Sequence, residues 1–255
     1  MSHQSRLRAW GRSWAGTLVS FACTIMVITA AKIAIAEPYY VPSGSMQPTL
    51  LIGDQMLATK YPYGYSAASL PSSIVLPGTA RIFGALPERG DVVVFRWPGD
   101  RSQIWVKRVI ALPGDRIALR AGRLSINGQP VELRPDGIGK AEAENGEQVP
   151  AERFIETLPG GREHAILRLR PPGLHDSMPE TVVPAGHVFV MGDNRDNSSD
   201  SRFPVRSGGI GMLPVENLVG RAETLVGSWD LAVKSQPVWT WPSGLRLSRF
   251  FTAIH

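Results

Sequence analysis

The chain has 255 residues, of which 43% are hydrophobic and 19% charged, a composition that excludes a wholly disordered protein and allows one or two domains with a sizeable core. Its net charge of +5 comes from the two ends, because residues 1–36 and 231–255 hold seven basic residues and no acidic one, which leaves 20 basic against 22 acidic residues between them. A nucleic-acid-binding protein usually carries its basic surface on the folded domain, so this distribution argues against nucleic acid as a partner.

The first predicted element is an apolar segment at residues 14–36. Its first 18 residues carry no charge. As a helix, the whole segment would rise about 35 Å, enough to cross a hydrocarbon core of about 30 Å. Three arginines precede it and Glu37 follows it, which predicts a cytoplasmic tail at residues 1–13, one transmembrane helix, and the rest of the chain outside. Cys23 lies in this segment, where we expect it to pack, and as the only cysteine it excludes an internal disulfide.

The same segment has features of a cleavable signal peptide. It follows basic residues and ends in Ala34-Ile35-Ala36, a small-x-small pattern at which such peptides are cut. Its apolar part is longer than the roughly 7–15 residues usual in a signal peptide, which favours a retained anchor.

Beyond residue 36 the sequence predicts a mainly β, antiparallel protein. β-branched and aromatic runs bounded by Gly, Pro or Asp are typical of strands, and Asn127-Gly128 between two alternating runs predicts a tight hairpin. Residues 135–180 are richer in Pro, Gly and Glu, and we expect them to form a solvent-facing insertion rather than core. The clearest strand runs lie at residues 91–97, 104–112, 187–191 and 217–229.

The C-terminal segment, residues 237–255, mixes aromatic and basic side chains. Trp, Phe and Arg together suit a membrane interface. An edge segment packed on the core would have the same composition, and the sequence leaves both interpretations open.

A turn at residues 42–50 follows the apolar segment and contains Ser43, Gly44 and Ser45 between two prolines. Gly44 lets another part of the chain approach closely, and a tight turn can present the Ser45 hydroxyl for attack. Ser43 could offer its hydroxyl, beside the amide of Ser45, to a developing oxyanion. Taken in isolation, a plain Ser/Gly/Pro loop explains the same residues.

The predicted strand at residues 104–112 contains two adjacent cations, Lys107 and Arg108. Alternation directs them to opposite faces, so each face must accept a cation among apolar neighbours. Burial lowers the pKa of a lysine, and a neutral amine near pH 7 is a competent general base for a serine hydroxyl. A surface lysine on a one-sided sheet is the alternative that this strand alone leaves open.

The segment at residues 192–202 is dense in Asp, Asn, Ser and Arg. Its spacing does not match an EF-hand calcium loop, and two arginines among the acids indicate internal ion pairs, so we predict no metal site. His187 lies just before the segment, but no G-x-S-x-G motif surrounds any serine, which argues against a Ser-His-Asp triad.

Together these segments resemble the bacterial type I signal peptidases, the membrane-bound Ser/Lys endopeptidases that remove presequences. The resemblance implies an antiparallel β-sheet catalytic domain with an inserted β subdomain. Residues 37–113 and 184–255 would form the catalytic core, and residues 114–183 the insert. The matching blocks occur in the family's order after a membrane span, at residues 42–54, 89–95, 106–115 and 192–202.

The resemblance also implies residue roles. Ser45 matches the nucleophile and Lys107 the general base, while Ser43 matches a serine that completes the oxyanion hole. Ser198 matches a serine that orients the lysine amine. The positions that match structural ion pairs are Arg108 with Asp193 and Asp200 with Arg202, and those that match shallow pockets for small side chains are Val41, Met46, Leu50 and Val106.

The activity implied by the resemblance is cleavage of signal peptides from exported preproteins after Ala-x-Ala motifs. It would take place at the outer, periplasmic face of the bacterial cytoplasmic membrane, with preproteins and phospholipid as partners and without a metal or organic cofactor. Two alternatives remain, a specialised relative that processes one dedicated exported substrate and an anchored β domain that binds exported proteins without cutting them. A Ser/Lys self-cleaving repressor would need a DNA-binding domain where this chain has its apolar segment.

Overall fold

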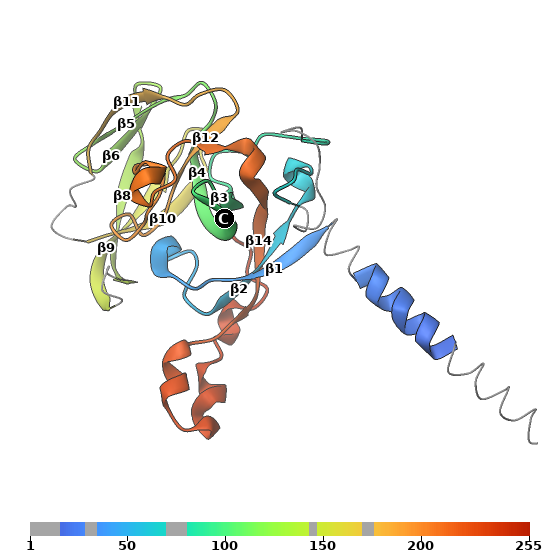
Figure 1. Ribbon diagram of the computed structural model, residues 1–255. Helices are drawn as coiled ribbons and strands as arrows, with labels where there is room; N and C mark the ends of the chain where they lie inside the picture. The colour runs from blue at the N-terminus through green and yellow to red at the C-terminus, as the bar shows by residue number, and fades with distance from the viewer. Residues whose placement is uncertain (1–15, 29–34, 70–80, 143–146, 170–175) are drawn as a thin grey trace, which may run out of the picture.

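The β-branched runs of the sequence form strands in the computed structural model, which describes residues 16–28, 35–69, 81–142, 147–169 and 176–255 (Figure 1). Within these residues the strands are β1 (Ala36–Tyr40), β2 (Asp54–Thr59), β3 (Val92–Trp97), β4 (Asp100–Ala111), β5 (Arg116–Arg120), β6 (Arg123–Ile126), β7 (Gln129–Pro130), β8 (Glu132–Glu142), β9 (Gln148–Thr157), β10 (Glu163–Arg168), β11 (Met178–Val182), β12 (His187–Met191), β13 (Leu213–Pro214) and β14 (Leu218–Ser228). The helical elements are a helix over residues 16–28 and the short 3-10 helices η1 (Gly44–Met46), η2 (Tyr61–Tyr63), η3 (Val205–Ser207), η4 (Val215–Asn217), η5 (Leu231–Ser235), η6 (Val238–Gly244) and η7 (Leu247–Arg249).

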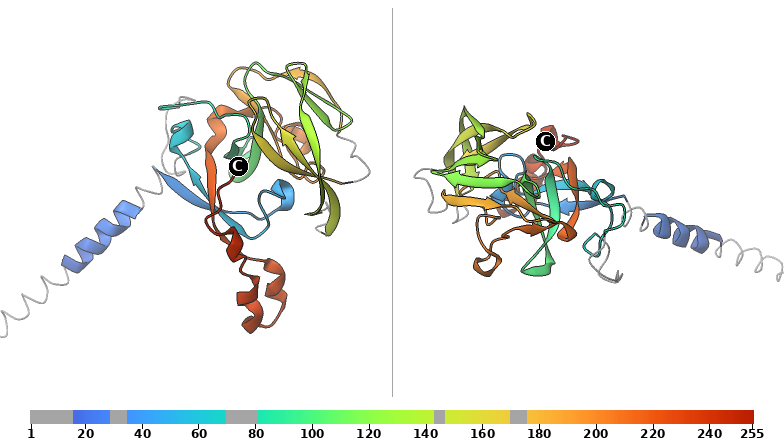
Figure 2. Two further views of the ribbon diagram at one scale, coloured as in Figure 1. Left: turned by 180° about the vertical axis from the view of Figure 1, so that it is seen from behind. Right: turned by 90° about the horizontal axis from the view of Figure 1, so that it is seen from above.

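The described strands pair into antiparallel sheets, so the protein is mainly β as the sequence predicts (Figure 2). A seven-stranded sheet has the order β1-β2-β14-β3-β4-β12-β13 and draws its strands from residues 36–111 and 187–228. Residues 116–182 supply a three-stranded sheet, β10-β9-β8, and a four-stranded sheet, β11-β5-β6-β7. Because β14 pairs with both β2 and β3, strands from early and late parts of the sequence lie side by side in one sheet.

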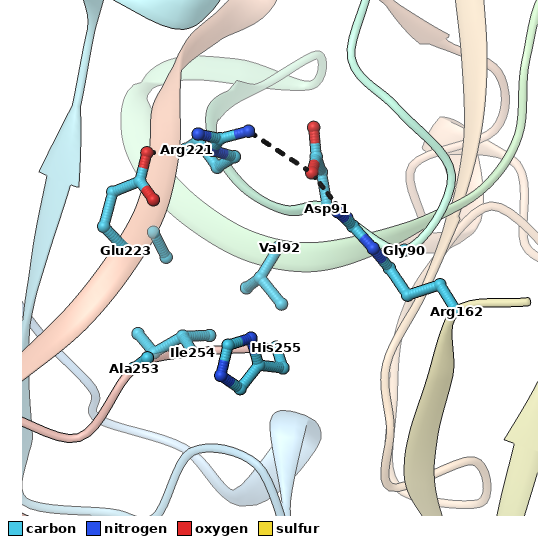
Figure 3. A pocket seen from close by; sticks show the side chains of 10 residues that line it. Gly90, Asp91, Val92, Arg162, Arg221, Glu223, Ala253, Ile254 and His255 are labelled. Carbon is cyan, nitrogen blue, oxygen red and sulfur yellow. Dashed lines mark hydrogen bonds and ion pairs between the residues drawn. The ribbon is translucent and has the colours of Figure 1, made fainter.

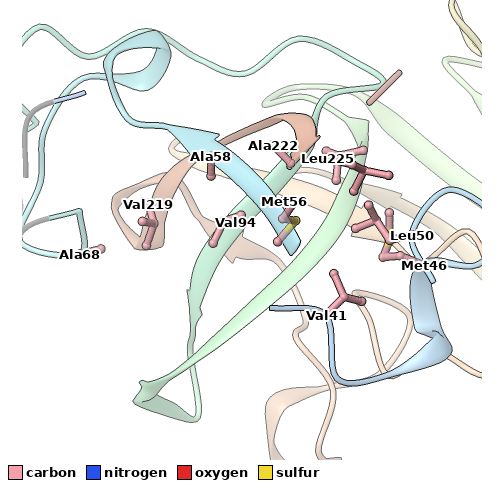
Figure 4. Packing of buried hydrophobic residues seen from close by; sticks show 11 residues of the cluster. Val41, Met46, Leu50, Met56, Ala58, Ala68, Val94, Val219, Ala222 and Leu225 are labelled. Carbon is pink, nitrogen blue, oxygen red and sulfur yellow. The ribbon is translucent and has the colours of Figure 1, made fainter. Parts of the chain in front are cut away.

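Strand β3 is apolar on both faces because both faces are covered. Val94 belongs to a buried cluster with side chains of β2 and β14, whereas Val93 belongs to a second cluster on the opposite face. The first cluster extends beneath η1, since Met46 and Leu50 are part of it (Figure 4). Each such side chain contributes about 1.5–3 kcal/mol by its burial, which anchors the turn that follows β1.

The predicted hairpin at Asn127-Gly128 is confirmed. Ile126 pairs with Gln129 across it, so the loop between β6 and β7 has two residues. Asn127 and Gly128 have φ angles of 53° and 78°, the left-handed conformation that a type I′ turn requires and that Asn and Gly adopt most readily.

The expectation of a poorly patterned, solvent-facing insertion over residues 135–180 is partly wrong: β8 is largely exposed, but the segment is well patterned and part of it is buried. Strands β8, β9 and β10 are regular, and Glu156 and His164 are buried at 2% and 5% exposure. Pro and Gly did not prevent pairing because they lie at a bulge, where the register between β8 and β9 shifts between Pro135 and Ile138.

The N-terminal expectations fall largely outside the described residues. The tail at residues 1–13 and parts of the apolar segment at 14–36 are not described, and the helix over residues 16–28 lies apart from the β body (Figure 1). Within the described ranges, no helix has both the length and the apolarity that a membrane crossing requires. Ala36 begins β1 instead of ending a helix, which corrects the end of the predicted span. Cys23 is exposed on the helix, and its packing remains a prediction.

The C-terminal residues form η5 to η7, which project from the seven-stranded sheet, and then return to β14 (Figure 1). Arg249 pairs with Asp54, and Arg246 donates to a main-chain carbonyl just before β2. The basic side chains of the segment are thus held against the body, which agrees with an edge segment. Trp239 and Phe251 are 79% and 80% exposed, and a lipid contact through them remains a prediction.

Candidate active site

Ser45 lies on η1, where the main chain on both sides of it is fixed. The Asn194 amide donates to the Ser45 carbonyl at 3.1 Å, and Asn194 Nδ2 donates to the Gly44 carbonyl at 3.2 Å. Met46, the next residue, is fully buried. The turn is therefore held by the hydrogen bonds from Asn194 and by the buried side chain of Met46. Ser45 itself is half-buried and lines a cleft.

Lys107 on β4 points at Ser45. Its side chain is 4% exposed, and Nζ lies 2.8 Å from Ser45 Oγ and 3.1 Å from the Val106 carbonyl. Burial lowers the pKa of Lys107 from its usual 10.5 to about 8, although the charges of Asp200 and Asp193 oppose the shift. About a tenth of the molecules then hold a neutral amine at pH 7, which can accept the Ser45 proton. The alternative of a surface lysine is therefore wrong.

A cleft of about 290 Å³ opens beside this pair. Ser43 lines it, with its Oγ 3.5 Å from Ser45 Oγ. Trp105 forms part of the wall, and its ring is stacked on Trp97 with 5.2 Å between ring centroids. The cleft thus combines two adjacent hydroxyls and one amine with a rigid aromatic wall.

Both expected ion pairs are present beneath the pair of Ser45 and Lys107. Arg108 is bidentate on Asp193, with Nε–Oδ1 2.9 Å and Nη2–Oδ2 2.8 Å. Arg202 is bidentate on Asp200 at 2.9 Å for both contacts. Burial acts to raise the pKa of Asp193 and of Asp200, but the paired arginines outweigh it, so both pKa values are lowered and both groups stay charged.

Ser198 does not make the contact expected from the resemblance. It is 8% exposed, and its Oγ has no hydrogen-bond partner within the described residues. Its position is nevertheless close to the site, because a Cβ on Gly192 would lie 2.3 Å from Ser198 Oγ and 2.4 Å from the Ser45 carbonyl oxygen. In the structure the second contact of the lysine amine is therefore the Val106 carbonyl, and the orienting role of Ser198 remains a prediction.

The expected pocket residues divide into two groups. Val106 lines the cleft. Val41, Met46 and Leu50 have 0–1% exposure and belong to the hydrophobic cluster under η1, so the expectation that they line the cleft directly is corrected (Figure 4). These side chains point into the core because their burial stabilises the turn that carries Ser45.

A second hollow, of about 210 Å³, lies between β3, β14 and the C-terminal residues (Figure 3). Its charges pair with one another, because Arg162 contacts Asp91 at 2.8 Å and Arg221 contacts Glu223 at 2.8 Å. Its lining contains no hydroxyl or thiol. The cleft beside Ser45 is therefore the better candidate for a reacting site.

Comparison with known proteins assigns the chain to a family. The model of a family described as signal peptidase, peptidase S26, matches residues 13–229. The chain belongs to this family. It is therefore a serine endopeptidase of the signal peptidase class.

Similar relatives are the signal peptidases I of Rickettsia typhi, 38% identical, and of Rickettsia canadensis and Rickettsia prowazekii, each 36% identical, with 92% of this chain and 92% of each relative covered. Among solved structures, a signal peptidase I from Enterococcus faecalis V583 is matched over 54% of this chain and 97% of that chain, with 22% identity and a TM-score of 0.31.

Sequence reasoning missed a buried charge network that joins β9 and β10 to the segment at residues 192–202. Arg195 is bidentate on Glu156 of β9, at 2.9 and 2.5 Å. His164 of β10 lies 3.3 Å from Glu156 and 4.0 Å from Asp193, and burial together with the charge of Arg108 lowers its pKa. No signal in the sequence pointed to this network, because residues 135–180 have the composition of an exposed insertion.

Asn194, Asn197 and Glu142 were also missed as parts of the site. Both asparagines donate through Nδ2 to the Glu142 carbonyl, at 2.9 and 2.8 Å. Asn194 and Asn197 lie within the polar segment at residues 192–202, and their place in that segment could have marked them as site residues. Glu142 had none, because its contacts depend on how β8 meets η1.

Proposed function

We propose that this protein cleaves signal peptides from exported preproteins, with Ser45 as the nucleophile and Lys107 as the general base. The observation that carries the proposal is the 2.8 Å contact between Lys107 Nζ and Ser45 Oγ at the edge of a cleft. It is supported by the lowered pKa of Lys107 and by the membership of the chain in the signal peptidase family. The proposed reaction uses neither a metal nor an organic cofactor.

In the first half of the reaction the neutral amine of Lys107 takes the proton of Ser45. Oγ bonds to the carbonyl carbon of the last signal-peptide residue, and the oxyanion is held by the Ser43 hydroxyl and the Ser45 amide. The protonated amine then gives its proton to the leaving nitrogen, and the C–N bond breaks. This leaves the signal peptide as an ester on Ser45 and the mature protein with a free amino terminus.

In the second half the neutral amine of Lys107 takes a proton from water. The hydroxide adds to the ester carbonyl, the C–Oγ bond breaks, and Ser45 recovers its proton from the amine. We propose that Ser198 and the Arg108–Asp193 and Arg202–Asp200 pairs hold the lysine for both steps. The charges of Asp193, Asp200 and Arg202, which act on Lys107, support the role of the two pairs.

We propose that the cleft accepts small side chains on both sides of one intervening residue, the Ala-x-Ala pattern. Trp105 is fixed by its stacking on Trp97, so the wall cannot move aside for a larger side chain. Val106 would contact the substrate, while Val41, Met46 and Leu50 would support the wall from behind.

We further propose that the apolar segment that precedes β1 anchors the protein in the bacterial cytoplasmic membrane with a single pass. The basic residues before it would stay in the cytoplasm and the β body would lie on the periplasmic side. Residues 37–113 with 184–255 would then act as the catalytic core and residues 114–183 as the insert. Preproteins in the same bilayer would meet the cleft at a high effective concentration.

The test is cleavage of a presequence peptide ending in Ala-x-Ala by the detergent-solubilised full chain, compared with Ser45→Ala. We expect the wild type to cut after the final Ala and Ser45→Ala to be slower by more than about a thousandfold. Ser248→Ala is a matched control, because Ser248 lies on η7 away from the cleft lining. Equal cutting by wild type and Ser45→Ala would exclude Ser45 as the nucleophile, and binding without cutting by a folded wild type would favour a non-catalytic domain.

A further inference from the structure

Glu142, the last residue of β8, packs directly on the turn that carries Ser45. An ideal Cβ on Gly44 would lie 2.3 Å from Glu142 Oε2 and 2.7 Å from Glu142 Cβ. Gly44 has an ordinary 3-10 conformation, which alanine could also adopt, and it is absent from the residues with positive φ. Gly44 therefore lacks a side chain because Glu142 occupies the space, and the backbone conformation does not require glycine.

The main chain of Glu142 joins the two catalytic segments. Its amide donates to Gln47 Oε1 at 2.7 Å, just after η1. Its carbonyl accepts from Asn194 and Asn197, both in the 192–202 segment. One residue of the inserted sheet thus bonds to the turn of the nucleophile and to the segment beneath the lysine.

The carboxylate completes this arrangement. It lies beside the Gly44 amide, which acts to lower its pKa, but burial outweighs this effect and raises the pKa. Oε2 is buried and has no hydrogen-bond partner within the described residues. A buried carboxylate oxygen without a partner costs folding free energy, so packing stability does not explain the choice of Glu at this position.

We propose that Glu142 is a positioning residue for Ser45, which makes the inserted sheet part of the catalytic apparatus. The inference rests on the proposed function, because it presupposes Ser45 as the nucleophile. Ser45 Oγ must stay within hydrogen-bond distance of Lys107 Nζ and at one angle to the cleft. The carboxylate and the main chain of Glu142 limit the movement of η1 in both respects.

The first test compares the wild type with Glu142→Ala and Glu142→Gln in cleavage of an Ala-x-Ala presequence peptide by the full chain. We expect kcat of Glu142→Ala to fall by at least about tenfold with KM within about twofold, because misplacing a nucleophile slows the chemical step more than binding. Glu142→Gln keeps an acceptor for the Gly44 amide, so its kcat should stay within about threefold of the wild type. Glu132→Ala, exposed at the other end of β8, is the matched control and should cut at the wild-type rate.

The pH profile separates positioning from an electrostatic effect. The charges that act on Lys107 are those of Asp200, Asp193 and Arg202, and Glu142 is not among them. The apparent pKa of the remaining Glu142→Ala activity should therefore equal that of the wild type. A shifted pKa, an unchanged kcat, or a loss of activity that accompanies unfolding would overturn the proposal.

The second test uses the close approach of Gly44 and Glu142. Gly44→Ala places a methyl group where Glu142 lies and should lower kcat strongly, whereas Gly44→Ala with Glu142→Gly removes the overlap. We expect the double variant to recover to about the level of Glu142→Gly alone, a coupling that independent residues do not show. Losses that multiply in the double variant would contradict the inference. A wild type that does not cut would instead defeat the proposed function, so the two failures are distinguishable.

Discussion

Lys107 carries an ionisable amine at a buried position of β4. Its lowered pKa and its cost to stability both follow from this burial. Burial lowers its pKa to about 8, and the carboxylates of Asp193 and Asp200 keep the value from falling further. The amine is thus basic enough to take a proton and neutral often enough to do so near pH 7. Because of the same burial, the protonated amine of Lys107 is poorly solvated in the folded state.

Replacing Lys107 by Met should abolish cleavage and raise stability. The folded pKa lies about 2.5 units below the usual 10.5, which corresponds to a cost of about 3 kcal/mol at pH 7. Between about pH 8 and 10.5 the folded state binds fewer protons than the unfolded state, so wild-type stability rises with pH there and the gap to Lys107→Met closes. Thermal unfolding at pH 7 and pH 10 measures this, with Lys140→Met on exposed β8 as control. A destabilised Lys107→Met would contradict the lowered pKa.

At the residue scale the sequence predicted which side chains meet beside the cleft and missed the residues that support them. Ser45, Lys107 and the two ion pairs were predictable because their residue types and local order carry the chemical information. Glu142 was not, since the information lies in the 2.3 Å approach to Gly44, which depends on the tertiary meeting of β8 and η1. Val41, Met46 and Leu50 were placed at the cleft although they are core, because an apolar residue near a site has the same pattern in either role.

At the scale of elements, β9 and β10 bring a buried charge network to the segment that carries Asp193. Burial acts to raise the pKa of Glu156, but the charge of Arg195 outweighs it and lowers the pKa, so the carboxylate stays ionised at pH values well below the usual pKa of a glutamate. The bidentate contact fixes the 192–202 segment to the insert.

Glu156→Gln should destabilise the protein by roughly 3–5 kcal/mol, because it leaves the buried Arg195 without the carboxylate that it contacts in a bidentate pair. The melting temperature at pH 7 measures the effect, and Glu132→Gln on the exposed end of β8 controls for the loss of a carboxylate as such. As the pH falls through the lowered pKa of Glu156, its contribution disappears and the two proteins should converge. Equal melting temperatures at pH 7 would show that the pair is not structural.

The strands themselves were largely predictable, because β3, β4, β12 and β14 each contain a run of β-branched or other apolar residues that stands out in the sequence. The insert was not, since Pro135 and Gly137 suggested a loop while the structure accommodates them in a bulge. The composition of a segment does not show whether a β-bulge can accommodate its Pro and Gly residues within paired strands.

At the scale of the whole molecule, the proposed anchor should matter for membrane substrates. When the full chain and a preprotein are reconstituted in the same vesicles, cleavage should be at least about tenfold faster than when they occupy separate vesicles, because both are confined to one bilayer. A soluble presequence peptide should be cut equally in both preparations. Equal rates for the preprotein in both preparations would contradict a role for the anchor.

The proposed mechanism depends most on Lys107 as a neutral base, and the pH dependence of kcat/KM tests this directly. For the wild type with an Ala-x-Ala peptide we expect kcat/KM to rise about tenfold per pH unit below a midpoint near 8 and to level off above it, because only the neutral amine is active. Lys107→Arg should be inactive at every pH, since guanidinium keeps its proton. A midpoint near 6.5, typical of a histidine base, or activity in Lys107→Arg would contradict the proposed mechanism.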